Sequence, residues 1–495
     1  MNYSIIRNLI GKILILLGLL MLPSVVVALI NIKAESYRNV VSFLIPIATL
    51  LIIGALFSFK KAKNASFGAR EGFVIVALSW ILMSVFGCIP FLISREIDDF
   101  FTAFFEITSG FTTTGASALT SSELESLSKS MLFWRSFSHW IGGMGILVFI
   151  LAVIPESKEG SAVHILRAES PGPQVGKLVS KMQVTSRILY LIYIGLTVLE
   201  TIILLILPDE KIGLFEALIY SFGTAGTGGF ATTAASIGAY SACTQYCIAI
   251  FMIIFGINFS MFYFALIGNW KDIIQNEELR WYLIIIVLSV SVVCANTYSI
   301  YNNFEEAFRH SLFQVASIIS TTGYSTTNYE TWPVLSVSIL IILTVFGSCA
   351  GSTSGGIKMS RFIILTKESK SKIKNMISPR KVEVVWMDGK PLDKNVIESV
   401  NAYFIIYIMT LFACSLLISI YNPNIENLDP LSSITASLTC ISNVGPGLGI
   451  VGPSGGFADF SGFSKIILSF EMIAGRLELF PMFILFSPRT WRKRI

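Results

Sequence analysis

Four short segments of this 495-residue chain carry main-chain groups that could bind a cation. Each runs through apolar and aromatic residues and ends in small hydroxylated residues and a glycine; aligned on that glycine, the copies superimpose Gly115, Gly229, Gly323 and Gly445. Backbone carbonyls can replace the hydration shell of a monovalent cation, and turning them toward one axis requires backbone angles that a Cβ penalises. The residues predicted to line this ion-binding site are Thr113, Thr114, Gly115, Thr227, Gly228, Gly229, Thr321, Thr322, Gly323, Asn443, Val444 and Gly445.

The four copies span 100–117, 214–233, 308–327 and 431–449, and each lies between two longer apolar runs. Taken singly, such a segment could be an ordinary Ser/Thr/Gly-rich loop or a helix-packing motif of small residues. Four copies at equivalent places favour re-entrant loops around a common axis, because irregular backbone at membrane depth persists only where protein buries it or where it lines a water-filled cavity. Short helices whose carboxyl ends point inward would place partial negative charge there, which favours a cation.

The composition places the chain in a membrane. Hydrophobic residues make up 54% of the chain and charged residues 14%, with mean hydropathy +0.72, whereas soluble proteins carry about 25% charged residues. The runs predicted to cross the membrane are 9–30, 40–59, 72–93, 131–154, 187–207, 244–268, 281–301, 333–366, 397–420 and 463–487. The first resembles a signal peptide, but a second apolar run follows at once without a small-residue cleavage site, so we expect a true span.

Basic residues indicate the orientation of these spans, since short cytoplasmic loops collect Lys and Arg. With both termini cytoplasmic, most of the 36 Lys and Arg residues fall on the cytoplasmic side, and the largest group lies in 358–394. The formal net charge of +5 therefore reflects topology, and we expect no nucleic-acid binding. Acidic residues on the opposite side could concentrate cations or simply cap helices.

The order of span, short helix, glycine-rich strand and span thus occurs four times after an N-terminal pair of spans. We predict an all-α integral membrane protein with four pseudo-repeated helix–pore loop–helix units around a central pore. The predicted units are an N-terminal hairpin at 1–66 and pore repeats at 67–160, 161–275, 276–375 and 376–495.

A second glycine-rich stretch interrupts the eighth apolar run. It consists of Cys349, Ala350, Gly351, Ser352, Thr353, Ser354, Gly355 and Gly356. Such residues break a helix at membrane depth, although a kinked helix packed closely on its neighbours is the alternative. Lys358 follows and could either join this stretch or extend to the cytoplasmic interface. Arg476 lies inside the last run, where an arginine is costly and normally faces a cavity or a partner; Glu471 and Glu478 are possible counter-charges.

Enzyme and cofactor chemistry find little support. The seven cysteines lack metal-ligand spacing, and the three histidines are scattered along the chain. The sequence has no Walker A motif and no GxGxxG after a strand, so we expect no ATP binding, no enzyme activity and no covalently bound cofactor. A sodium-coupled secondary transporter of another solute or cation remains an alternative, because such folds also contain unwound glycine-rich helices. They usually have inverted repeats, whereas these four share one direction.

Further motifs accompany the four glycine segments. They are HWIGGMG at 139–145, PGP at 171–173, GSCAGSTSGGIK at 347–358, NVGPG at 443–447 and GRLELF at 475–480. Together they resemble the Trk/Ktr/HKT superfamily of potassium transporters, and most closely its bacterial Trk-type pore subunits. The resemblance covers essentially the whole chain, including the N-terminal hairpin that distinguishes the Trk type.

The resemblance implies a function and an assembly. It implies a K⁺ selectivity filter at the four glycine segments, with four glycines favouring K⁺ over Na⁺, and an intramembrane gate formed by residues 349–356, Lys358 and Arg476. It also implies a homodimer with one pore per chain in the bacterial cytoplasmic (inner) membrane, and a cytosolic nucleotide-binding regulatory ring of the RCK type. The basic stretch 358–394 is either the docking surface for that ring or a contact with anionic membrane lipid. Ala116 and Phe230 stand where a tetrameric channel repeats Tyr, which leaves room for looser selectivity.

Overall fold

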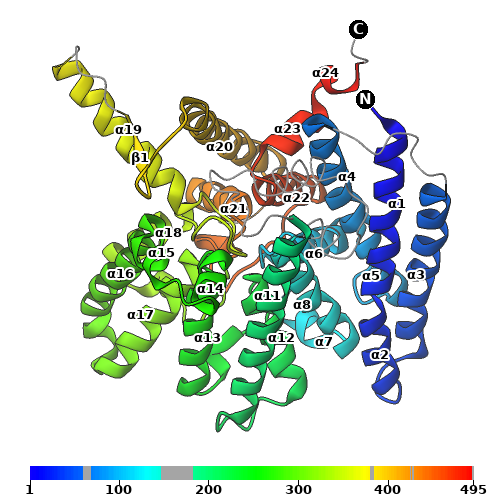
Figure 1. The fold of residues 1–495 in the computed structure, drawn as a ribbon. Helices are drawn as coiled ribbons and strands as arrows, with labels where there is room; N and C mark the ends of the chain where they lie inside the picture. The colour runs from blue at the N-terminus through cyan, green and yellow to red at the C-terminus, as the bar shows by residue number, and fades with distance from the viewer. Residues whose placement is uncertain (60–67, 146–181, 379–383, 424, 426–427, 493–495) are drawn as a thin grey trace.

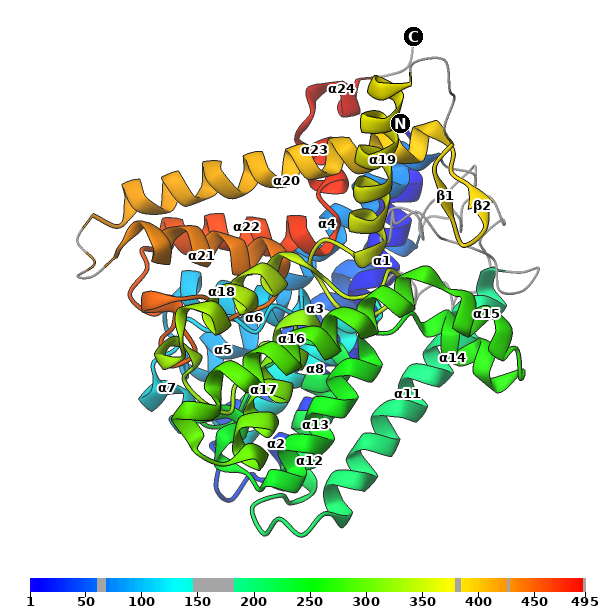
Figure 2. The ribbon, with the colours of Figure 1, turned by 90° about the vertical axis from the view of Figure 1, so that its left-hand side faces the viewer.

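The computed structural model describes residues 1–59, 68–145, 182–378, 384–423, 425 and 428–492. These residues are mostly helical, which confirms the predicted all-α class (Figure 1). Two short strands, β1 (Trp386–Met387) and β2 (Lys390–Pro391), pair antiparallel in a small hairpin. Figures 1 and 2 show both termini on the same side of the molecule, from which α19 (Met359–Ile377) also projects.

The N-terminal hairpin consists of α1 (Tyr3–Leu20), α2 (Leu22–Ile30) and α3 (Tyr37–Ser58). Helices α1 and α3 approach closely at two glycines, since a Cβ built on Gly11 would lie 2.8 Å from the Gly54 carbonyl oxygen. Small residues at such a crossing let two helix backbones pack directly against each other in a membrane. The hairpin contacts α4 through α1 and α8 through α2, so it lies beside the first repeat.

The remaining elements follow the predicted repeating order. Each repeat begins with a long helix: α4 (Ala69–Gly87) with α5 (Ile89–Ser94), α11 (Met182–Ile206), α16 (Glu277–Tyr301) and α20 (Lys394–Tyr421). A short pore helix follows: α6 (Phe100–Phe111), α12 (Leu214–Gly226), α17 (Phe304–Ile319) and α21 (Pro430–Ser442). A second helix ends each repeat: α8 (Lys129–Gly143), α13 (Ala242–Phe255), α18 (Val334–Val345) and α22 (Gly462–Arg476). Shorter elements connect these: α7 (Ser121–Ser126), η1 (Ser236–Ala239), α14 (Phe259–Leu266), α15 (Trp270–Gln275), η2 (Tyr329–Thr331), η3 (Gly449–Val451), α23 (Phe480–Phe486) and α24 (Pro488–Trp491).

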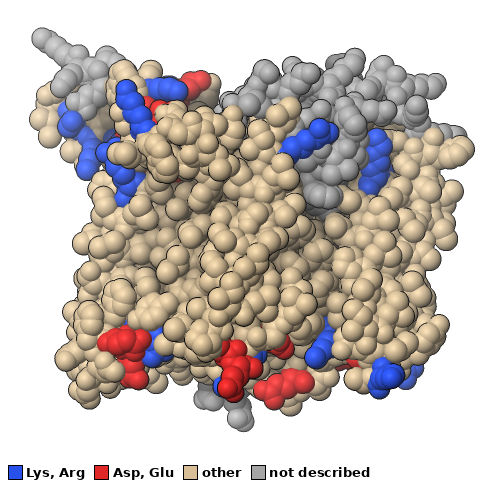
Figure 3. Space-filling model, turned by 60° about the horizontal axis from the view of Figure 1, so that its bottom comes forward, with Lys and Arg blue, Asp and Glu red and all other residues tan. Residues whose placement is uncertain are grey.

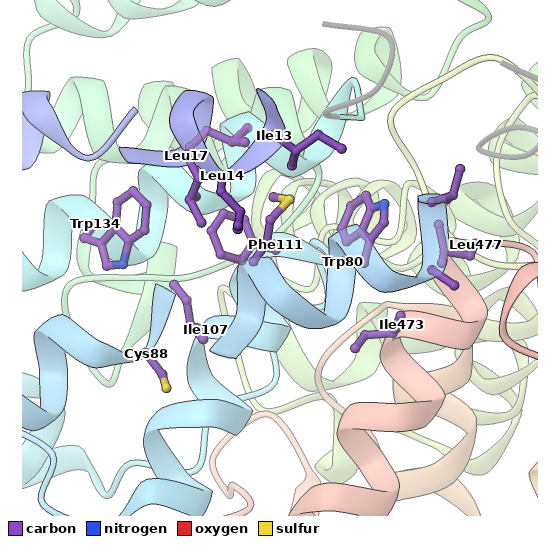
Figure 4. Close-up of a cluster of buried hydrophobic side chains, with 14 of the residues drawn as sticks. Ile13, Leu14, Leu17, Trp80, Cys88, Ile107, Phe111, Trp134, Ile473 and Leu477 are labelled. Carbon is purple, nitrogen blue, oxygen red and sulfur yellow. The ribbon is translucent and has the colours of Figure 1, made fainter. Parts of the chain in front are cut away.

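The four repeats form a closed ring. The second helix of each repeat contacts the pore helix of the next one: α8 with α12, α13 with α17, α18 with α21, and α22 with α6. Figure 4 shows the core at the last of these junctions, where Leu17, Trp80, Phe111, Trp134 and Ile473 come together from α1, α4, α6, α8 and α22. Apolar packing therefore joins the two ends of the chain and closes the ring.

Within the described residues, six helical segments are long and apolar enough to cross a membrane, and α13 with α14 makes a seventh that is bent by 91°. The prediction of unbroken spans was wrong at 244–268 and at 463–487. The first breaks at Gly256, which is pressed against another helix: a Cβ there would lie 2.3 Å from the Tyr282 hydroxyl. The second breaks after Arg476, where Glu478 and Leu479 both have positive φ. Residues 146–154 of the expected span 131–154 lie outside the described part of the chain.

The surface agrees with a multi-pass membrane protein. The face drawn in Figure 3 has a wide band without charged side chains, between one rim that carries mainly Lys and Arg and another where Asp and Glu gather beside further Lys and Arg. Such a band is expected of a surface that faces lipid, because charged side chains at bilayer depth are costly.

Candidate functional site

All four pore helices end in the same backbone geometry. The first residue beyond the helical turn is left-handed in each repeat: Thr113, Thr227, Thr321 and Asn443 have φ of 55°, 55°, 57° and 54°. The next N–H donates to a carbonyl five residues back, at 2.8 or 2.9 Å, as in a Schellman helix end. Residues with a Cβ rarely adopt this conformation. Its recurrence at one position of four diverged repeats indicates that the conformation is required there.

The strands that follow, which we call the glycine strands (113–116, 227–230, 321–324 and 443–446), meet around one axis. Their glycines have φ of 78°, 79°, 82° and 99°, a region that favours glycine. A Cβ built on each glycine would collide with a carbonyl oxygen of the next repeat. These pairs are Gly115 with Gly228 (2.0 Å), Gly229 with Thr322 (2.0 Å), Gly323 with Val444 (2.1 Å) and Gly445 with Thr114 (2.7 Å). The series returns to the first repeat, so the structure brings together the four glycines that the sequence aligned.

A cavity of about 140 Å³ opens at the end of the ring where the glycine strands leave it. All four glycines line it, together with side chains such as Arg135 and Phe230. The carboxyl ends of four helices border this axis, and each carries partial negative charge. Carbonyl oxygens and helix ends around one axis make an environment that suits a cation without any carboxylate ligand.

The glycine-rich stretch at 347–357, which we call the intramembrane loop, packs against the opposite end of the glycine strands. The Gly355 N–H donates to the Thr321 hydroxyl at 2.7 Å. A Cβ on Gly355 would lie 2.5 Å from the Ser442 carbonyl oxygen, so the loop backbone also touches the fourth repeat. The loop is anchored to the α13–α14 break, where Cys349 N–H donates to the Gly256 carbonyl (3.1 Å). The prediction that this stretch interrupts a helix is therefore confirmed: α18 ends at Val345 and α19 begins at Met359.

Arg476 connects the intramembrane loop to the first repeat. Its guanidinium donates to the Thr353 carbonyl at 2.7 Å and to the carbonyls of Gly142 and Gly143 at 2.5 and 2.6 Å. The carboxylates proposed as its counter-charges have other partners: Glu478 pairs with Arg361, and Glu471 accepts from the Ser437 hydroxyl at 2.6 Å. Main-chain carbonyls at the end of α8 and in the loop thus hold this arginine.

Lys358 is buried rather than extended to the interface. Its side chain is 7% exposed, and its ammonium donates to the Ser354 carbonyl at the end of the intramembrane loop. Of the two alternatives that the sequence left open, the structure has the one in which Lys358 belongs to the loop.

Glu278 on α16 is a loop contact that the sequence analysis missed. One of its carboxylate oxygens accepts from the Ala350 N–H at 2.8 Å and from the Ser360 N–H at 2.9 Å, and thereby links the intramembrane loop to the first turn of α19. The side chain is 2% exposed. The available signal was a carboxylate at the start of a long apolar helix, next to Glu277, which forms an ion pair with Lys367. That pattern also fits an ordinary acidic helix start, so only the fold identifies the contact.

Two of the acidic residues on the face opposite the termini act as helix caps. Asp99 accepts from the Thr102 N–H and begins α6, and Asp429 accepts from the Ser432 N–H and begins α21, each at 2.8 Å. Hydrogen bonds from the Ser432 side chain and main-chain N–H lower the pKa of Asp429 below its ordinary value. The capping alternative therefore accounts for both carboxylates.

Comparison with known proteins gives consistent matches along the whole chain. A family model described as TrkH, cation transport protein, matches residues 40–493. The Trk system potassium uptake protein TrkH of Vibrio parahaemolyticus is 32% identical over 507 residues, which cover 99% of this chain and all of the relative. The Trk system potassium uptake protein TrkG of Escherichia coli strain K12 is 32% identical over 504 residues, or 99% of each chain.

A solved structure agrees with these matches. The crystal structure of the potassium transporter TrkH from Vibrio parahaemolyticus superimposes with a TM-score of 0.85 at 30% sequence identity. The superposition covers 99% of this chain and all of that chain. The similarity therefore includes the N-terminal hairpin, all four repeats and the elements that surround the glycine strands.

Proposed function

We propose that this chain, which belongs to the TrkH family of cation transport proteins, takes up potassium ions across the bacterial cytoplasmic membrane. The named relatives are transport proteins rather than enzymes, and those compared above are potassium uptake proteins. One observation carries the proposal: four glycine strands, each beginning with a left-handed residue, close a ring in which a main-chain oxygen of each strand lies against the glycine of its neighbour.

The glycine strands act as a K⁺ selectivity filter. The residues that line it are those aligned in the sequence, from Thr113 to Gly115, Thr227 to Gly229, Thr321 to Gly323 and Asn443 to Gly445. Their carbonyls exchange for the water around the ion, and the rigid ring sets the spacing that discriminates K⁺ from Na⁺. The membrane potential contributes about 2.3 kcal/mol per elementary charge per 100 mV, enough to drive concentrative entry of a cation.

The intramembrane loop is the gate. It packs against the cytoplasmic end of the glycine strands through the Gly355–Thr321 contact. The side chain of Lys358, directly after the loop, adds a positive charge there through its hydrogen bond to Ser354. Arg476 fastens the loop to the end of α8, so positive charge and main chain together obstruct the path below the filter. Opening requires that the Arg476 contacts with Thr353, Gly142 and Gly143 be released.

We place both termini and α19 in the cytoplasm, on the basis of the excess of Lys and Arg on that side. Exposed Lys370 and Lys372 on α19 form part of a basic surface suited to a soluble nucleotide-binding ring of the RCK type. The active unit is a homodimer in which each chain holds one pore.

Complementation tests the proposal. A bacterium that lacks potassium uptake is expected to grow on low-K⁺ medium when it produces this chain, and excess Rb⁺ should compete with K⁺ more strongly than Na⁺ does. Gly229→Ala should abolish the rescue, because its Cβ would lie 2.0 Å from the Thr322 oxygen. Gly268→Ala is the matched control, since Gly268 also has positive φ but no atom within 4 Å of the added Cβ. Growth without K⁺ selectivity, or rescue by Gly229→Ala, would contradict the proposal.

A further inference from the structure

Phe230, the residue directly after Gly229, is held by two side chains from another repeat. Arg135 and His139 lie four residues apart on α8 and therefore on one face of that helix. The Arg135 guanidinium carbon lies 3.7 Å from the centre of the Phe230 ring, and the ring centres of His139 and Phe230 are 4.2 Å apart. All three side chains are at most 2% exposed. Two side chains of a helix in the first repeat thus pack against the glycine strand of the second repeat.

His139 also joins the two repeats through its ring nitrogens. Nδ1 lies 2.8 Å from the Gly110 carbonyl at the end of the first pore helix, and the Phe230 N–H points at Nε2 from 3.3 Å. Because a carbonyl can only accept and an N–H can only donate, Nδ1 must carry the proton and Nε2 must be free to accept. The ring lies directly behind the glycine strand, where a Cβ on Gly228 would be 2.1 Å from its Cγ. One neutral imidazole therefore connects a pore helix to the neighbouring strand.

Arg135 is fixed in turn by Glu106 of the first pore helix. Its Nε lies 2.9 Å from a Glu106 carboxylate oxygen, and the carboxylate is fully buried. The other Glu106 oxygen accepts from the Ala118 N–H at 2.6 Å and from the Ser117 hydroxyl at 2.7 Å. The carboxylate thereby holds the chain just beyond the first glycine strand while its arginine holds the second.

The four repeats differ in the residue that follows the glycine, and this difference explains why the ion pair of Arg135 and Glu106 is present. The residues after the four glycines are Ala116, Phe230, Tyr324 and Pro446. Tyr324 can reach a neighbouring strand by itself, because its hydroxyl lies 3.4 Å from the Phe230 carbonyl oxygen. Phe230, the matching residue of the second repeat, has no hydroxyl with which to reach the first strand in the same way. The side-chain link between the first two strands therefore comes from other residues, which are Glu106, Arg135 and His139.

We propose that Arg135 and His139 on α8 and their partner Glu106 on α6, together called the α8 brace, are positioning residues that set the ion selectivity of the pore. They fix the distance between the first and second glycine strands and so the spacing of the carbonyl oxygens. This inference rests on the proposed function, in which those oxygens select K⁺. The brace itself contacts no ion; it acts through Phe230 and through the segment that follows Gly115.

Reversal potentials of the full-length purified chain in planar bilayers, with K⁺ on one side and Na⁺ on the other, test the proposal. Arg135→Lys keeps the charge but loses the flat guanidinium that stacks on Phe230. His139→Leu removes both ring hydrogen bonds, whereas His139→Gln retains an amide that can donate or accept in their place. We expect the first two variants to lower the K⁺/Na⁺ permeability ratio about tenfold, equivalent to about 1.4 kcal/mol, and His139→Gln to lower it less.

The permeability ratio separates positioning from simple structural support, because fewer folded molecules reduce the current but leave the ratio unchanged. Phe230→Leu keeps the buried ion pair of Arg135 and Glu106 but removes the ring on which Arg135 stacks. If Arg135→Lys does not fold, this variant tests the proposal in its place. Arg309→Lys is the control: Arg309 also pairs with a glutamate, Glu305, but on a partly exposed face away from the glycine strands. A wild-type ratio in folded Arg135→Lys, His139→Leu and Phe230→Leu would overturn the brace, whereas a wild-type chain that does not prefer K⁺ would overturn the proposed function instead.

Discussion

Replacing Gly323 by serine gives a quantitative test of the ring of glycine strands. Gly323 has φ of 82°, and a Cβ built on it would lie 2.1 Å from the Val444 carbonyl oxygen and 2.9 Å from Pro446 Cδ. Real Cβ contacts are essentially never closer than 3.0 Å, so the oxygen or the new side chain must move by about 0.9 Å. The Val444 oxygen belongs to the fourth repeat, and its displacement alters the ring on two sides.

The free-energy cost of a serine at position 323 can be bounded from its backbone conformation alone. A residue with a Cβ in a sparsely populated positive-φ conformation costs about 1–3 kcal/mol, and the ring can relieve that strain only by moving ion ligands. If this energy is lost from the discrimination between K⁺ and Na⁺, the permeability ratio falls roughly five- to 150-fold. We expect Gly323→Ser to conduct both ions, with a ratio lowered into that range.

The assay is the bi-ionic reversal potential in planar bilayers, supported by ⁸⁶Rb⁺ uptake in competition with Na⁺. Gly268→Ser serves as the matched control, because Gly268 has a similar φ of 75° and open space around the added Cβ. It experiences the same backbone strain without disturbing any carbonyl of the ring. A Gly323→Ser ratio equal to that of the wild type would remove Gly323 from the filter and refute the reasoning.

The remaining predictions concern the gate and its regulation. Arg476→Ala should raise ⁸⁶Rb⁺ uptake, because the intramembrane loop loses its link to the end of α8; reduced or unaltered uptake would count against a gating role. Glu278→Ala leaves the N–H groups of Ala350 in the loop and Ser360 on α19 without their carboxylate, at about 1–3 kcal/mol each. We therefore expect a leak in flux assays with an unchanged K⁺/Na⁺ ratio, and a changed ratio would place Glu278 in the filter instead. Reversing the charges of Lys370 and Lys372 should weaken binding of an RCK-type ring in pull-down experiments, whereas Lys33→Glu on the opposite face should not; wild-type affinity in the double variant would exclude α19 as the docking site.

The sequence predicted which four glycines form the ring, but not the backbone conformation that brings them together. Glycine at one position of four similar segments is visible without coordinates, because positive φ and close backbone approach both exclude a Cβ. The left-handed residues two positions earlier gave no such signal: Thr113, Thr227 and Thr321 have ordinary side chains, and their φ follows from the way each pore helix ends. The sequence indicated a break in a second helix at the intramembrane loop, where all eight residues of 349–356 are small, but not at Gly256, where one glycine packs against Tyr282.

The sequence by itself determined the features that depend on local chemistry. Its apolar composition places the chain in a membrane, its long apolar runs have the length needed to cross a bilayer, and four of its segments share a glycine. The tertiary structure decided which groups meet. Arg476 lies within a few residues of two carboxylates in sequence, yet it binds carbonyls that are 123, 333 and 334 positions away, while Glu478 pairs with Arg361. The partner of a buried charge is set by through-space distance in a medium of low dielectric constant, and that distance exists only once the four repeats have closed around their axis.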